Sequence, residues 1–147
     1  MKLLLATLLG LLLGAGSYTA FYARSTSYLS DDPRACLNCH IMREAFDTWE
    51  HSSHHARAGC NDCHVPHDFL GHWAIKALNG YHHSEAFTLQ NFHEPIRIRP
   101  VNAAVLNANC LRCHGDFVSE ITAARVHGDP DVSCARCHAG VGHRGHR

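Results

Sequence analysis

The sequence predicts a mainly α-helical protein with long loops, in which one N-terminal transmembrane helix precedes a small domain rich in cysteine and histidine. Three observations predict this class. An uninterrupted apolar run opens the chain, and the 147 residues include 8 Cys and 15 His. No six-residue stretch alternates apolar and polar residues convincingly, as a half-buried β-strand would. The 13 basic and 13 acidic residues balance, so no positive field indicates nucleic-acid binding.

The apolar run covers residues 3–23 and lies between Lys2 and Arg24. About 20 apolar residues in a helix span roughly 30 Å, which is the thickness of the hydrocarbon core of a bilayer. Aromatic side chains near the C-terminal end of the run match the interfacial belt of a transmembrane helix: Tyr18, Phe21 and Tyr22. The run therefore predicts a membrane-spanning helix.

A cleaved secretory signal peptide is the competing interpretation of this run, with its apolar region at residues 3–13. Cleavage requires small residues in an A-x-A-like pattern, which the residues before Ala20 match loosely and those before Ala23 match poorly. We therefore expect residues 1–24 to be an uncleaved signal anchor in the inner membrane. Its basic N-terminus favours a cytoplasmic start, which would place residues 25–147 in the periplasm as one domain.

Every cysteine belongs to a C-x-x-C-H motif, and the four motifs are Cys36–His40, Cys60–His64, Cys110–His114 and Cys134–His138. This motif attaches c-type haem through two thioethers, and its histidine can reach the iron. Disulfides would not require a histidine after each second cysteine, and zinc sites have no use for one at that position. The sequence therefore predicts four covalently bound haem c groups, with thioethers from Cys36, Cys39, Cys60, Cys63, Cys110, Cys113, Cys134 and Cys137.

The motifs form two pairs, at residues 36–64 and 110–138, and the spacing within each pair is 24 residues. An internal duplication is plausible. Conventional apolar burial would be thin in so small a domain, so we expect the haems to form its core. Haems packed this tightly suit electron transfer better than substrate chemistry at each iron. Residues 91–100, with Pro95 and Pro100, are expected to connect the two pairs.

Low-spin electron-transfer haems need a second strong axial ligand, His or Met. Met42 stands out because it lies two residues past His40 and Met1 is the only other methionine. The residues alone do not pair the remaining histidines with irons. The candidates are His51, His54, His55, His67, His72, His82, His83, His93, His127, His143 and His146.

The chain resembles the NapC/NirT family of membrane-anchored multihaem quinol dehydrogenases, and within it the small tetrahaem (NrfH-type) subunits of cytochrome c nitrite reductase. The resemblance rests on the anchor, the two C-terminal motifs and three strings: SYLSDDPRACLNCHIM, TWEHSSHHARAGCNDCHVP and KALNGYHHSEAFTL. It implies that the protein oxidises menaquinol and passes electrons to a periplasmic multihaem reductase. That reductase would be cytochrome c nitrite reductase, which converts nitrite to ammonium in anaerobic respiration, and the two would form a hetero-oligomer.

The resemblance also implies axial ligands. In such subunits the first motif reads C-x-x-C-H-x-M, and the methionine, here Met42 rather than His40, binds iron. The proximal ligands of the other haems would be His64, His114 and His138. The distal ligands would be His143 for haem two, His54 for haem three and His127 for haem four, although the assignments of His54 and His127 are exchangeable.

The resemblance places a quinol site beside haem one, where Lys76 matches an expected lysine. Family members also carry an acidic residue near the open side of haem one, but residues 76–83 contain none. His83, His82 or the upstream Asp68 would then substitute as the partner that takes the quinol proton.

Two other functions remain open from the sequence. One is a membrane-tethered electron carrier without its own quinol site, which predicts a solvated Lys76. The other is a small multihaem reductase with an open iron, which is disfavoured because the short chain leaves little protein for a substrate pocket. Residues 68–89 are predicted to form an amphipathic helix, lying either on the membrane surface or against haem two.

Overall fold

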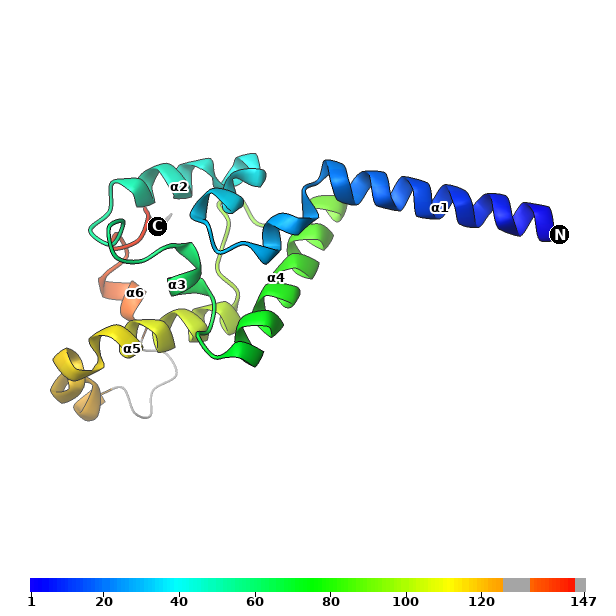
Figure 1. Cartoon of the computed structure of the whole chain (residues 1–147). Coiled ribbons are helices and arrows are strands. Elements are labelled where there is room, and N and C mark those ends of the chain that lie inside the picture. Colours follow the sequence, from blue (N-terminus) through cyan, green and yellow to red (C-terminus); the bar gives the residue numbers. More distant parts are fainter. Residues whose placement is uncertain (126–132, 145–147) are drawn as a thin grey trace.

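The computed structural model describes residues 1–125 and 133–144, and within these ranges every regular element is a helix (Figure 1). The predicted mainly helical class is therefore confirmed. The elements are α1 (Lys2–Tyr22), η1 (Ser25–Leu29), η2 (Pro33–Asn38), η3 (His40–Met42), α2 (Arg43–Glu50), α3 (Cys60–His64), α4 (Phe69–Leu89), α5 (Pro100–Arg125) and α6 (Cys134–Cys137), where η marks a 3₁₀ helix. The expected connector is non-helical until α5 begins at Pro100.

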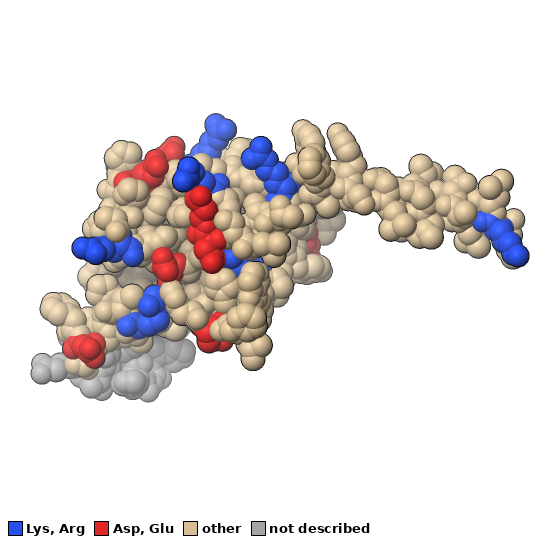
Figure 2. All heavy atoms as spheres, in the orientation of Figure 1, with Lys and Arg blue, Asp and Glu red and all other residues tan. Residues whose placement is uncertain are grey.

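Helix α1 projects away from the rest of the chain (Figure 1), and none of its 21 residues is buried. Figure 2 shows that charged side chains lie on the domain, while the projecting helix carries a basic residue at its tip, where Lys2 begins α1. Among the described residues, α1 is the helix long and apolar enough to cross a membrane. Hydrocarbon is the solvent that matches so apolar and exposed a surface.

The domain has little apolar core of its own. Val65, which is 3% exposed, is the one buried hydrophobic residue among the described side chains. The chain exposes 11721 Å² for a mass of 16.3 kDa, whereas a folded globular protein of this mass exposes about 7,500 Å². The projecting α1, none of whose residues is buried, accounts for part of this excess. A domain with so few buried side chains fits the prediction that bound groups form its core.

Helix α4 borders the side of the domain nearest to α1 (Figure 1), and η1 contacts both helices. Asp68 begins α4, because its carboxylate accepts a hydrogen bond from the backbone N–H of Gly71 at 2.6 Å. The inner face of α4 carries His72, Lys76 and His83, which share a side of the helix by their spacing. Several large apolar side chains of α4 are exposed: Phe69, Leu70, Trp73, Leu78 and Tyr81. Their exposure favours the membrane-surface position over the buried one.

Asparagines of α5 hold the second and fourth motifs in place. Asn109 is 8% exposed, and its amide donates to the carbonyls of Cys63 at 3.0 Å and Val65 at 2.9 Å. Asn107 accepts a hydrogen bond from the backbone N–H of Cys134 at 3.1 Å. Backbone N–H and C=O groups that are removed from water need hydrogen-bond partners. The two asparagines supply these partners and so fix the motif segments to α5.

Candidate functional site

The four C-x-x-C-H motifs lie on separate elements. The first passes from η2 into η3, the second is α3, the third lies within α5, and the fourth spans α6 and His138. None of the eight motif cysteines is fully buried, and none is paired in a disulfide. Each sulfur is therefore available for a thioether.

Neighbouring motifs meet through their cysteines. The side chains of Cys36 and Cys60 are in contact, which brings the first two motifs together. Cys110 in the third motif lies close to Cys63 of the second and hydrogen bonds with Cys134 of the fourth. The four attachment points consequently form a row that follows the order of the motifs in the sequence.

Two pairs of histidine rings face each other at similar separations. The ring centroids of His64 and His143 are 6.1 Å apart, with planes inclined by 18°. Those of His54 and His114 are 6.0 Å apart, with planes inclined by 73°. Two imidazole nitrogens on opposite sides of one metal, each about 2 Å from it, place the ring centroids about 6 Å apart. Both pairs therefore have the spacing of axial ligands, as the resemblance predicted for haems two and three.

The surroundings of these rings suit metal ligation. His54 Nδ1 lies 3.1 Å from the carbonyl oxygen of Val141; a hydrogen bond donated there leaves Nε2 free to bind a metal. Burial, with a smaller contribution from His143, lowers the pKa of His64 to about 4. The ring is therefore neutral at physiological pH, which is the form that binds metals.

The axial ligands of all four haems stay predictions, and those of the first and fourth haems have no ring pair to support them. His40 and Met42 both lie on η3, where His40 is exposed and Met42 is half-buried. His138 follows α6 and is exposed. His127 lies outside the described residues, and so its predicted pairing with the fourth haem has no geometry to support it.

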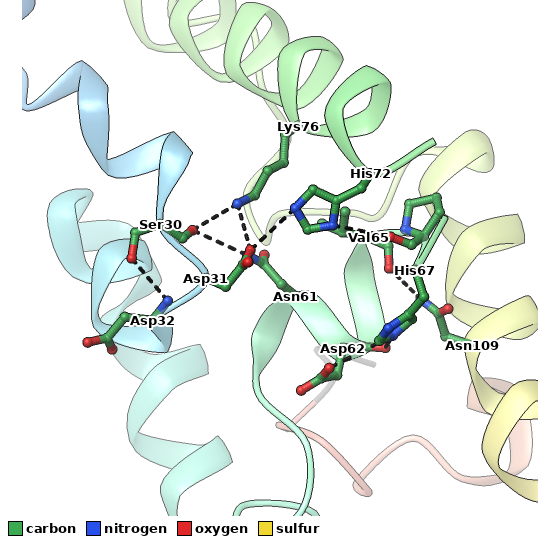
Figure 3. A network of polar contacts seen from close by, with 11 residues as sticks. Ser30, Asp31, Asp32, Asn61, Asp62, Val65, His67, His72, Lys76 and Asn109 are labelled. Carbon is green, nitrogen blue, oxygen red and sulfur yellow. Dashed lines mark hydrogen bonds and ion pairs between the residues drawn. The ribbon is translucent and has the colours of Figure 1, made fainter. Parts of the chain in front are cut away.

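Lys76 is the centre of a polar cluster on the inner face of α4 (Figure 3). The residue is 6% exposed. Its Nζ donates to Asp31 Oδ1 at 2.6 Å and to the carbonyl of Ser30 at 2.9 Å. Asn61 Nδ2 donates to the same carboxylate oxygen at 2.7 Å, and His72 Nε2 lies 3.5 Å from it. The electron-carrier alternative predicted a solvated lysine, and the burial of Lys76 does not fit it.

His83 lies on the same face of α4, where its Nδ1 is 2.8 Å from the hydroxyl oxygen of Tyr28. Tyr28 in turn lies near Cys36 and Cys39 of the first motif. Burial, together with the charges of His82 and Arg99, lowers the pKa of His83, and burial raises that of Tyr28 to about 12. A neutral imidazole has one nitrogen that can accept a proton, and the Tyr28 hydroxyl is a hydrogen-bond partner that orients the ring.

The other two candidates for the quinol proton have different partners. His82 Nδ1 lies 3.2 Å from Glu85 Oε2, and the carboxylate of Asp68 caps α4. The acid that the structure does bring to Lys76 is Asp31, which sequence reasoning missed. Its one sequence signal was its place five residues before Cys36, in the string that carried the resemblance.

An anchoring apolar helix, a row of C-x-x-C-H motifs and opposed imidazole pairs define a small membrane-anchored c-type cytochrome. The profile of the NapC/NirT cytochrome c family, N-terminal region, matches residues 1–147, and the chain belongs to this family. Membership implies that haem c is bound covalently, and the motif cysteines and spaced histidines described above fit it. The predicted resemblance is thereby confirmed.

Sequence similarity to named cytochromes extends over most of the chain. It is 37% identical over 140 residues to the cytochrome c-type protein NrfH of Wolinella succinogenes, covering 89% of this chain and 79% of the relative. It is 32% identical over 114 residues to the cytochrome c nitrite reductase subunit NrfH of Nitratidesulfovibrio vulgaris, covering 78% and 69%. A crystal structure of the cytochrome c nitrite reductase NrfHA complex bound to the HQNO inhibitor matches with a TM-score of 0.66 and 30% identity, covering 98% of this chain and 91% of the solved one.

Proposed function

We propose that this protein is a quinol dehydrogenase subunit that oxidises menaquinol and passes the electrons to cytochrome c nitrite reductase, which reduces nitrite to ammonium. The observation that carries the proposal is the buried ammonium of Lys76, which lies close enough to Cys36 of the first motif to influence it electrostatically. The likeness to subunits of cytochrome c nitrite reductase supports the partner.

The chain would hold four haems in a row. Bound haem supplies reversible one-electron transfer at its iron. The eight motif cysteines would anchor the haems, His64 with His143 would ligate haem two, and His54 with His114 would ligate haem three. Met42, in place of His40, would ligate haem one, and methionine generally raises a haem's reduction potential relative to bis-histidine ligation. His138 and His127 would serve haem four.

The quinol would bind at the inner face of α4, where Lys76 and His83 lie two helical turns apart. An ammonium has three N–H donors, and two of those of Lys76 are directed at Asp31 and Ser30. The third would donate to a quinol oxygen and hold it beside the first motif. His83, oriented by Tyr28, is the favoured base on this face, ahead of His82 and Asp68.

The topology supports a path from the membrane to a partner. Residues 1–24 would anchor the chain in the inner membrane, and residues 25–147 would form the periplasmic domain. The first motif follows α1 closely, whereas α6 lies on the side of the domain away from α1 (Figure 1). Electrons would enter at the first motif and leave at the far end to the reductase, within a hetero-oligomer.

Anaerobic reduction of the purified, detergent-solubilised protein by a menaquinol analogue tests this function. Reduced-haem absorbance follows the reaction, and dithionite serves as the control that every haem accepts electrons. We expect rapid reduction of the wild-type protein and loss of that rate in Lys76→Ala. Reduction by dithionite alone would instead support the tethered carrier that takes its electrons from another protein.

A further inference from the structure

The Lys76 cluster joins a buried cation to a solvent-exposed carboxylate, because Nζ of Lys76 lies 2.6 Å from Oδ1 of Asp31. The side chain of Lys76 is 7% exposed, whereas that of its partner Asp31 is 64% exposed. A site that oxidises quinol must release two protons for every two electrons, and a charged ammonium has no lone pair to take one. A proton that reaches Lys76 therefore needs an acceptor beyond it.

We propose that Asp31 is the acceptor through which the quinol hydroxyl beside Lys76 releases its proton to solvent, a role that rests on the proposed quinol oxidation. In this step Nζ of Lys76 first passes one of its protons to the carboxylate of Asp31 and becomes a neutral amine. The O–H bond of the quinol hydroxyl beside it then breaks, the proton of that hydroxyl binds the lone pair of Nζ, and the haem chain would take one electron. The proton on Asp31 leaves for water. The proton of the other hydroxyl passes to His83 and a second electron leaves, which completes the oxidation to quinone.

The contacts of Asp31 suit a conduit rather than a store of protons. Mainly through its hydrogen bond from Lys76, the pKa of Asp31 is held below its usual value, so a proton it accepts passes on quickly. Asn61 fixes the same oxygen from α3. The titratable groups that face this carboxylate are Lys76 and His72, both from α4.

His72 offers a second branch for the proton. Its Nδ1 lies 3.3 Å from the carbonyl of Pro66, while its Nε2 lies 3.5 Å from Asp31. Both ring nitrogens of His72 thus lie near oxygen atoms that can accept a hydrogen bond. Figure 3 shows Asp31 between Lys76 and His72, reached by dashed lines from both.

Asp31→Asn tests the role, because asparagine keeps an oxygen that accepts from Lys76 but cannot take up a proton. Asp31→Glu restores a carboxylate, and Asp32→Asn is a matched control at the neighbouring carboxylate, which caps η2. Each full-length, haem-loaded protein is reduced by the menaquinol analogue across pH, and dithionite reduction checks its haems. We expect Asp31→Asn to lower kcat by about 10²-fold, as for loss of a proton-transfer group, with little change in KM. Asp31→Glu should recover most of the rate.

Asp31→Ala adds a readout that a purely structural role would not move. Because the position is open to solvent, added acetate should raise the rate of this variant in proportion to its concentration, whereas chloride at equal ionic strength should not. Wild-type kinetics in Asp31→Asn, or a slow Asp31→Ala that acetate does not accelerate, would overturn the role of Asp31 alone. If the analogue fails to reduce the wild-type protein, quinol oxidation and this inference fall together.

Discussion

Replacing Asp31 with alanine is expected to destabilise the domain more than replacing Lys76 with methionine, although both substitutions break the same ion pair. The asymmetry follows from burial, because the lysine side chain is 7% exposed and the aspartate side chain is 64% exposed. If Lys76 is removed, the exposed carboxylate of Asp31 is hydrated by the water already around it. If Asp31 is removed, the buried ammonium of Lys76 stays without a compensating charge, and this destabilises the folded state.

The contacts set the expected sizes. Asp31→Ala leaves Nζ with the carbonyl of Ser30 as its remaining hydrogen-bond acceptor. Removing one partner of a fully buried pair costs about 3–5 kcal/mol, and water near the open carboxylate position reduces this to about 2–3 kcal/mol. Lys76→Met keeps an unbranched apolar side chain in the buried space, and its loss of an ion pair to an exposed carboxylate costs about 1 kcal/mol.

Urea unfolding of the detergent-solubilised, haem-loaded proteins, followed by circular dichroism, measures both changes. The double variant Lys76→Met/Asp31→Ala is the internal control. It should be no less stable than Asp31→Ala alone, because it no longer contains an unpaired buried charge. A Lys76→Met protein as unstable as Asp31→Ala, or strictly additive effects in the double variant, would refute this reasoning.

In EPR spectra of the oxidised protein, His54→Ala should remove a low-spin signal with a large maximal g value, because its ring is nearly perpendicular to its partner's and leaves two iron orbitals almost degenerate. His143→Ala should instead remove a rhombic signal, since that pair is nearly parallel; loss of the same signal from both variants would contradict the pairings. The hydrogen bond from the α4 lysine lowers the pKa of Asp31. The stability advantage of wild type over Asp31→Asn should therefore be present above the usual carboxyl pKa and be lost as the pH falls below about 4. A urea-unfolding series that shows this advantage growing in acid would reverse the sign. Asn109→Leu should lower the free energy of unfolding by about 2–4 kcal/mol, because it leaves two carbonyls of the second motif segment without their donor. A loss below about 1 kcal/mol in the same assay would show that other groups satisfy them.

The anchor and the haem motifs were predictable because each depends on residues that are close together in the sequence. A bilayer requires an unbroken apolar run, and haem attachment requires two cysteines and a histidine at fixed spacing. The ring pairs are different in kind. His64 and His143 lie far apart in the chain, and no local pattern joins them, so only the resemblance anticipated their pairing.

The acid beside Lys76 could not be predicted from the local sequence. Residues 76–83 contain no acidic residue, and the nearest carboxylate upstream is that of Asp68. Asp68 directly precedes α4, which is typical of a helix N-cap, and the structure gives it that role. Asp31 is 45 residues from its partner; only the docking of the segment after η1 onto α4 brings the two together.

The most direct test of the central claim uses the full-length protein in liposomes that contain menaquinol, with purified cytochrome c nitrite reductase catalytic subunit and nitrite added outside. Ammonium formation and haem oxidation state are followed together under anaerobic conditions. We predict that ammonium forms only when quinol, this protein and the reductase are all present, and that Lys76→Ala leaves the haems oxidised. Equal ammonium formation without this protein, or with Lys76→Ala, would contradict the claim that it carries electrons from quinol to nitrite reduction.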